Sequence, residues 1–140
     1  MIAQRANPLP IVYSCSGCST AAQIANFIAL RLDREGKAEM SCIAGVGGGV
    51  HHLVKTAIAG RPILALDGCP LACTRACLNQ CGVEPTAHVV LSEHGVKKRY
   101  HAEIDLAEAE AMLARVRPTA IRLHRGWGIG PVAAAKPKEA

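Results

Sequence analysis

The residues with the clearest chemical potential are two cysteines that follow a short apolar segment. Residues 63–66 (Ile-Leu-Ala-Leu) have the pattern of a strand buried on both faces, and Asp67-Gly68 supplies turn residues. Pro70 suits the first position of a helix, which makes Cys69 the predicted N-cap and places Cys73 one turn later. Four helical residues rise about 6 Å, so the two sulfurs are able to bind one tetrahedral metal ion.

Strand and helix patterns alternate along the chain. Predicted strands cover residues 9–14, 39–44, 63–66 and 86–91, and helical patterns follow them at residues 19–36, 50–60, 71–80 and 105–116. This alternation predicts an α/β fold: one three-layer domain with a mostly parallel four-stranded sheet and helices on both faces. We expect the strand order 2-1-3-4, which sets the first three strands side by side.

Three cysteines stand at the predicted carboxyl ends of these strands. Cys15, Cys42 and Cys69 each come at or just past a strand end, although they are far apart in sequence. In open parallel sheets, ligands sit at the carboxyl ends of the strands, near the point where the strand order reverses. Small core cysteines placed by chance give no reason for such convergence. We therefore predict that Cys15, Cys42, Cys69 and Cys73 form a four-thiolate metal site, with zinc as the expected metal.

Three further cysteines leave alternatives open. Cys77 and Cys81 continue a four-residue spacing, but a continuous helix from Cys69 to Cys81 spans about 18 Å, so these two are predicted to be buried apolar residues. Cys18 forms a C-x-x-C with Cys15 at a strand-to-helix turn, which is also typical of thiol redox or sulfur-handling proteins. Soft thiolates also hold iron-sulfur clusters, so an iron-sulfur protein is a second alternative.

Composition bounds the class of protein. The chain has 140 residues, of which half are hydrophobic, 3% are aromatic and seven are cysteine, and its formal net charge is +5. So few aromatic rings and so modest a charge disfavour a nucleic-acid surface. The odd number of cysteines and the absence of a signal-peptide pattern predict a cytoplasmic protein rather than a secreted disulfide scaffold. No apolar run approaches the roughly 20 residues needed to span a membrane.

The remaining segments organise the chain around one domain. We expect an N-terminal arm over residues 1–8, a metal-binding α/β domain over residues 9–116, and a basic, mobile tail over residues 117–140. Trp127 in that tail is a candidate anchor for a protein partner. The glycine run at residues 45–49 lacks the last glycine of a dinucleotide fingerprint and is predicted to be a flexible rim around the thiols. His51 and His52, at the next helix start, are expected to face solvent.

The sequence also resembles the DGC-domain family of zinc-binding proteins, which is named for the triplet present here as Asp67-Gly68-Cys69. The resemblance covers residues 11–98. It is carried by the segments Cys15-Ser-Gly17, Gln23-Ile-Ala-Asn26, Met40-Ser-Cys42-Ile-Ala-Gly45-Val-Gly47, Asp67-Gly-Cys69-Pro-Leu-Ala-Cys73 and Gly95-Val-Lys97-Lys98. The resemblance implies a zinc site of four cysteines, by position Cys15, Cys42, Cys69 and Cys73, and no established reaction. Cys18, Cys77 and Cys81 depart from the usual pattern of the family.

The turn after the third predicted strand yields a finer expectation. The carboxylate of Asp67 is expected to accept hydrogen bonds from backbone N–H groups of the turn. Gly68 is expected to serve either a positive φ angle or the close approach of the metal. Cys69, at the helix N-terminus, is then expected to be the most acidic thiol in the metal-free protein, because a helix N-terminus and neighbouring cations favour thiolate.

Overall fold

The structure is a computed structural model, and it describes residues 8–126. All but the last residue of the expected N-terminal arm lies outside these residues. Residues 127–140 of the expected tail, including Trp127, also lie outside them.

The sheet consists of four parallel strands in the order β2-β1-β3-β4, as predicted. The strands are β1 (Ile11–Ser14), β2 (Glu39–Met40), β3 (Ile63–Asp67) and β4 (Ala87–Val90). Every residue of β1 and β3 is buried, which agrees with their continuous apolar character. The strand predicted over residues 39–44 is shorter than expected, because its last residues begin a helix instead.

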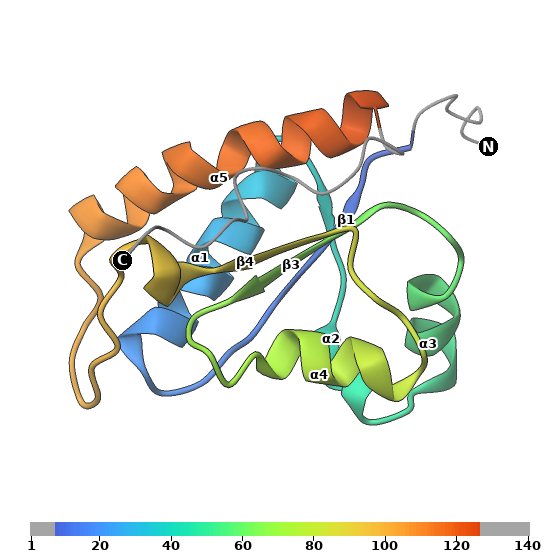
Figure 1. The fold of residues 1–140 in the computed structure, drawn as a ribbon, viewed down its shortest axis with the longest axis horizontal. Coiled ribbons are helices and arrows are strands. Elements are labelled where there is room, and N and C mark those ends of the chain that lie inside the picture. The colour runs from blue at the N-terminus through green and yellow to red at the C-terminus, as the bar shows by residue number, and fades with distance from the viewer. Residues whose placement is uncertain (1–7, 127–140) are drawn as a thin grey trace.

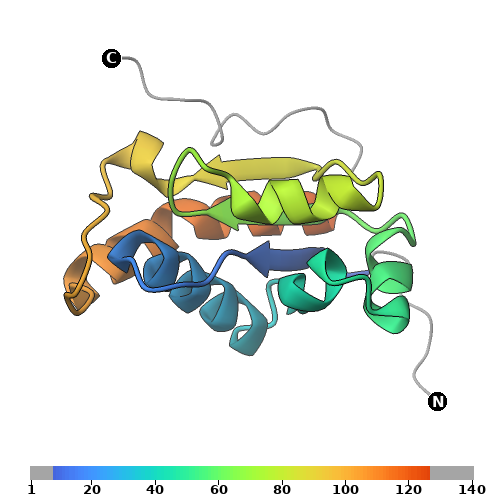
Figure 2. The ribbon, with the colours of Figure 1, turned by 90° about the horizontal axis from the view of Figure 1, so that it is seen from below.

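Helices cover both faces of the sheet (Figure 1). One face carries the two long helices α1 (Thr20–Arg34) and α5 (Leu106–Gly126), and the other carries the shorter helices α2 (Ile43–Gly47), α3 (His51–Ala57) and α4 (Cys73–Gln80). Figure 2 looks from the side of these shorter helices, with the sheet behind α4. A short 3-10 helix, η1 (Leu91–His94), follows β4. The predicted three-layer α/β fold is confirmed.

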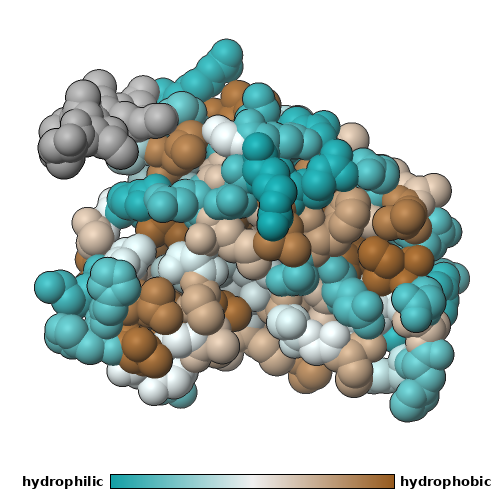
Figure 3. Space-filling model, turned by 180° about the vertical axis from the view of Figure 1, so that it is seen from behind, coloured by the Kyte–Doolittle hydropathy of each residue, from teal (hydrophilic) through white to brown (hydrophobic). Residues whose placement is uncertain are grey.

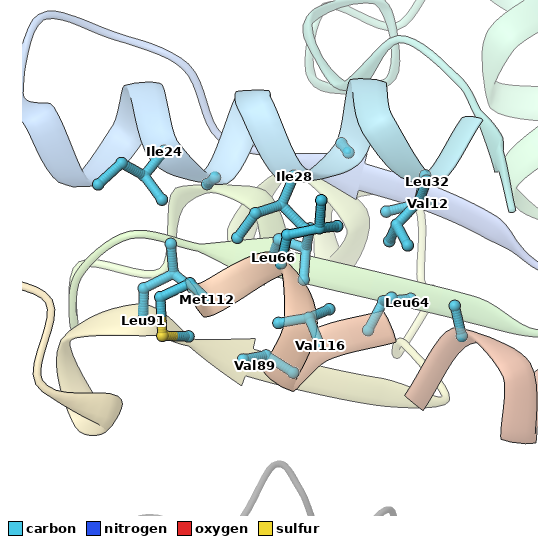
Figure 4. Close-up of a cluster of buried hydrophobic side chains, with 14 of the residues drawn as sticks. Val12, Ile24, Ile28, Leu32, Leu64, Leu66, Val89, Leu91, Met112 and Val116 are labelled. Carbon is cyan, nitrogen blue, oxygen red and sulfur yellow. The ribbon is translucent and has the colours of Figure 1, made fainter. Parts of the chain in front are cut away.

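Alternate residues of the central strands supply two separate cores. Val12, Leu64 and Leu66 point towards α1 and α5, where they pack against Ile28 and Val116 (Figure 4). The intervening strand residues pack on the opposite face against α2, α3 and α4. This second core contains Ile11, Tyr13, Val46, Ala57, Ile63, Ala65 and Leu78. The sheet is therefore held from both sides, and its carboxyl edge is positioned by both helix layers.

Helix α5 is longer than the sequence predicted. The pattern ends before Pro118, since proline lacks an N–H group and usually breaks a helix, but α5 continues through Pro118 to Gly126. The extension is stabilised by burial of Thr119, Ala120 and Leu123. The preceding Arg117 also donates from Nε to Oε1 of Glu35, at 2.9 Å. Packing onto α1 thus overrides the local helix-breaking signal.

The surface seen from behind is mixed, with hydrophobic patches separated by hydrophilic side chains (Figure 3). Within residues 8–126, no helix combines the length and the apolar character that a membrane crossing requires.

Candidate metal centre

The sheet brings three of the predicted ligands to one edge. Cys15 is the first residue after β1, and Cys42 and Cys69 are each the second residue after β2 and β3. These strands are neighbours in the sheet and run parallel. Their carboxyl ends therefore lie at the same edge of the sheet, as the predicted strand order requires. Cys73 is the first residue of α4, which packs against β3.

Cys15 is tied directly to the turn that follows β3. Its backbone N–H donates to the carbonyl oxygen of Leu66 at 3.0 Å, which extends the pairing of β1 with β3 by one residue. Its sulfur accepts the N–H of Gly68 at 3.2 Å. A sulfur on one strand end is thus fixed against the Asp67-Gly68 turn of its neighbour.

The environment of Cys15 keeps its thiol protonated at neutral pH. Burial raises the pKa of Cys15 to about 11, against the opposing effect of the Gly68 N–H. Negative charge on Asp67, Cys73 and Cys69 raises the pKa further, so these three groups act on one sulfur. A metal ion that binds Cys15 must therefore displace a firmly held proton.

Helix α4 begins later than predicted, so Cys69 is not its N-cap. Residues 69–72 form a turn in which the N–H of Ala72 donates to the carbonyl of Cys69 at 3.1 Å, and Pro70 occupies its second position. Ala72 has a left-handed φ of 52° and precedes the first helical residue, Cys73. The prediction that Cys69 lies at the amide-rich end of the helix is wrong, because proline suits a turn as well as a helix start.

The carboxylate of Asp67 occupies that helix end instead. Its Oδ1 accepts the N–H of Thr74 at 2.7 Å, and its Oδ2 accepts the N–H of Arg75 at 3.3 Å and lies 2.8 Å from Nε2 of His88. Asp67 is 1% exposed. Burial alone would raise its pKa, but hydrogen bonds from His88, Thr74 and Arg75 outweigh burial and hold the pKa below its usual value. Asp67 thus accepts backbone N–H groups as expected, but these belong to α4 and not to the turn, so the bonds fasten α4 to β3.

The cation beside Cys69 comes from a distant segment. Lys98 Nζ donates to the Cys69 sulfur at 3.3 Å, and hydrogen bonds to Tyr100 and Cys69 raise the pKa of Lys98. The neighbouring residue Arg99 is held at the start of α1: Thr20 N–H donates to the carbonyl of Arg99, and Thr20 Oγ1 accepts the N–H of Arg99, both at 2.9 Å. The basic segment is thereby fixed beside the thiol edge.

Cys42 plays a local role at the same edge. It is the N-cap of α2, where its sulfur accepts the N–H of Gly45 at 3.4 Å. All seven cysteines are free, so four thiols are available at this edge. Within residues 8–126, no three Cys, His, Asp or Glu side chains are already arranged to hold a metal ion. The donor set would suit a thiophilic metal ion, which these side chains could hold only if they moved closer together.

The other cysteines and the paired histidines lie apart from the turn. Cys18 is exposed. Cys77 is half-buried against Gly47, and Cys81 is half-buried at the second core, where its thiol donates to the Leu78 carbonyl. Cys77 and Cys81 are therefore less buried than the sequence suggested. His51 and His52 are exposed at the start of α3, as expected.

Two side chains that contact the turn after β3 were not predicted from the sequence, Lys98 and His88. Lys98 was noted only in a segment that carries the family resemblance, and nothing local indicated its contact with Cys69. His88 had a usable signal: it is a polar residue inside the apolar strand β4, which the expected strand order places beside β3 and its buried Asp67. A buried carboxylate requires hydrogen-bond partners, and the neighbouring strand was the place to seek one.

Gly68 is required by packing. Its φ is not positive, and a Cβ built there would lie 2.6 Å and 2.7 Å from the backbone C and O atoms of Ala21 on α1. We predict that Gly68→Ala lowers the free energy of unfolding by about 1–3 kcal/mol in metal-free protein, measured by urea denaturation. The control is Ala72→Gly in the same turn, which relieves a left-handed φ and is expected to be neutral or stabilising. Equal stability of Gly68→Ala and wild type would refute this packing account.

Lys98 is expected to accelerate reactions of Cys69. In metal-free protein near neutral pH, Cys69 should react with iodoacetamide faster than Cys77, and Lys98→Met should slow it roughly two- to five-fold, because an adjacent cation favours the reacting thiolate. Lys98→Arg should restore most of the rate, and Lys97→Met serves as the control for net charge. Peptide mapping after timed alkylation measures each site. An unchanged Cys69 rate in Lys98→Met would show that the contact has no kinetic role.

Comparison with known proteins gives two matches. The family model described as the DGC domain matches residues 11–116. The curated "Anaerobic and virulence modulator AnvM" of Pseudomonas aeruginosa is 59% identical over 110 residues, which cover 79% of this chain and 84% of that protein. No solved structure matches. The family match includes all four predicted ligands and the Asp67-Gly68 turn.

Proposed function

Because the chain belongs to the DGC domain family, we propose that it is a metal-binding protein that holds zinc through the thiolates of Cys15, Cys42, Cys69 and Cys73. The observation that carries this proposal is the strand order, which delivers three of these cysteines to adjacent strand ends. Four thiolates complete a tetrahedral zinc sphere and leave no position for water, which favours a structural or carrier role over hydrolytic catalysis.

The bound metal would cross-link segments that the fold already brings close. Cys15 would join the end of β1, Cys42 the start of α2, and Cys69 and Cys73 the connection from β3 to α4. Zinc with four thiolates carries a net charge of −2, and the Lys98 ammonium beside Cys69 would offset part of it. Binding energy at such a site also stabilises the fold.

Zinc affinity is expected to rise with pH. Since the pKa of Cys15 is about 11, its thiol is protonated throughout the physiological range, and each bound metal ion releases that proton. Cys15 alone should contribute about a tenfold gain in affinity per pH unit below its pKa. Zinc titration against a chelator of known proton affinity at pH 6.5, 7.5 and 8.5 measures this slope. A pH-independent affinity would exclude Cys15 as a ligand that ionises on binding.

A thiol redox role for Cys15 and Cys18 is the second candidate. The exposed Cys18, three residues after Cys15, favours this role, and so does the name of the relative from Pseudomonas aeruginosa, an anaerobic and virulence modulator. The raised pKa of Cys15 argues against this residue as the attacking thiol, because the thiolate is the nucleophile. We therefore rank metal binding above redox exchange, and we propose a modulatory role in the cytoplasm, where free thiols persist.

One experiment separates the candidate chemistries. Untagged protein purified without oxygen is subjected to elemental analysis, absorption spectroscopy and thiol counting. Colourless protein with one equivalent of zinc would support the proposal. Bound iron with visible absorption bands would favour the iron-sulfur alternative, and metal-free protein that readily forms a disulfide between Cys15 and Cys18 would favour the redox alternative.

A further inference from the structure

A groove of about 620 Å³ opens beside the thiol edge, between α1 and the segment from β2 to α3. Its volume is within the range of small-molecule sites, roughly 300–1,000 Å³. Cys42 is the one predicted metal ligand among its lining residues, so the groove is distinct from the Asp67-Gly68 turn. The groove adjoins the carboxyl ends of β1 and β2, the edge where open parallel sheets bind ligands.

An unpaired hydroxyl group lies beneath the surface of the groove. Ser14, the last residue of β1, lines the groove and is 2% exposed, and its Oγ has no hydrogen-bond partner. Leaving a buried hydroxyl unpaired is destabilising, so native structures rarely tolerate it without cause. Rotation of the Ser14 side chain towards the groove would allow a ligand oxygen to satisfy this hydroxyl.

The apolar side chains that line the groove indicate that the rest of such a ligand is apolar. Leu30, Met40, Ile43 and Leu53 form an apolar surface, and Leu30 is one of the exposed large hydrophobic residues of the protein, at 36%. An apolar body seated here would remove this surface from water.

Two polar side chains of the lining are able to donate hydrogen bonds to an anion. Asn26 offers an amide, and Arg34, which donates from Nη1 to the Leu30 carbonyl, retains further guanidinium N–H groups. Asp33 also lines the groove and opposes an anion, but its Oδ1 already accepts the N–H of Met40 at 2.9 Å. We propose that the groove binds a small carboxylic acid with an apolar body, with the carboxylate held by Ser14 and Arg34.

The probe for this proposal is decanoate. Binding to the full-length protein is measured by calorimetry. Two comparison ligands keep the ten-carbon chain: decylammonium, whose head group is positively charged, and decanol, whose head group is uncharged. Decanoate is expected to bind at least tenfold more tightly than either. Equal binding of decanol would overturn the carboxylate assignment, preference for decylammonium would show that Asp33 dominates, and absence of binding by all three would overturn the site.

Two pairs of variants locate the binding. Ser14→Ala should weaken decanoate binding roughly two- to tenfold while leaving the midpoint of urea denaturation unchanged or higher, since no protein partner is lost. Thr119→Val removes another orphaned buried hydroxyl, on α5, and should not affect binding. Leu30→Glu should abolish binding, whereas Leu106→Glu, at an exposed apolar position on α5, should not. Equal effects of either variant and its control would overturn the location.

The groove and the metal proposal fail separately. Cys69→Ser should retain decanoate binding, because Cys69 does not line the groove, and Ser14→Ala should retain the metal content of the wild type. Loss of zinc in Cys69→Ser with intact decanoate binding supports both proposals. If the wild type contains zinc but does not bind decanoate, the metal proposal is supported and the proposal that the groove binds a carboxylic acid is wrong.

Discussion

Serine substitution of a single predicted ligand is expected to release the metal. Cys69→Ser and Cys15→Ser should each lower zinc affinity by several orders of magnitude, because a hydroxyl is a poor replacement for a thiolate in a closed four-sulfur site. The stability that metal contributes should be lost with it, by several kcal/mol. Elemental analysis and thermal denaturation with and without added zinc measure the two effects.

Cys77→Ser is the matched control. Cys77 lies on α4, one turn after Cys73, and is half-buried against Gly47, so its removal changes local packing without removing a predicted ligand. It should keep the zinc content of the wild type. Cys42→Ser tests the ligand whose sulfur now caps α2. Full zinc content in Cys42→Ser together with loss in Cys18→Ser would move the fourth ligand to Cys18.

The sheet was predictable because its strands are continuous apolar segments. The order 2-1-3-4 followed from placing the cysteine-bearing strand ends together, and the structure has that order. The start of α1 was also readable, since Ser19 is a standard N-cap and its hydroxyl accepts the N–H of Ala22 at 3.1 Å. The strands and the start of α1 depend on local residue type, whereas the strand order was inferred from the shared position of distant cysteines.

The connections at the thiol edge were less predictable, because non-local contacts decide them. Pro70 fits a turn as well as a helix start, and Asp67 caps α4 across seven residues, so no local signal fixed the first helical residue. Cys42 caps α2 with a sulfur, which no capping preference anticipates. Lys98 reaches Cys69 only because its segment is fastened to α1 at Thr20. Residue chemistry thus identified the candidate ligands, and tertiary contacts determined their surroundings.

Removal of the Asp67 carboxylate is expected to be the most destabilising change near the site that leaves every cysteine in place. Asp67→Ala leaves the N–H groups of Thr74 and Arg75 without their acceptor at a helix start that has no side-chain N-cap, and it deprives His88 of its partner. We predict that the free energy of unfolding of metal-free protein falls by about 3–5 kcal/mol. A buried carboxylate with several hydrogen bonds contributes more to stability than an ordinary exposed helix cap does. Urea denaturation in the presence of a chelator measures it.

Asp105→Ala is the control for capping alone. Asp105 Oδ1 accepts the N–H groups of Ala107 and Glu108 at the exposed start of α5, so its removal should cost only about 0.5–2 kcal/mol. If Asp67→Ala lowers the free energy of unfolding no more than Asp105→Ala does, then the burial of Asp67 and its contact with His88 contribute nothing to stability.

The pH dependence distinguishes the charge of Asp67 from its shape. The folded state holds the pKa of Asp67 below its ordinary value of 3.8, so the folded state binds a proton less readily than the unfolded chain. Its stabilising contribution is therefore complete well above pH 3.8 and is lost as pH falls through the lower folded value. The difference in unfolding free energy between wild type and Asp67→Ala should shrink as pH falls below about 4. A difference that stays constant to pH 2.5 would show that packing, and not the carboxylate charge, fastens α4 to β3.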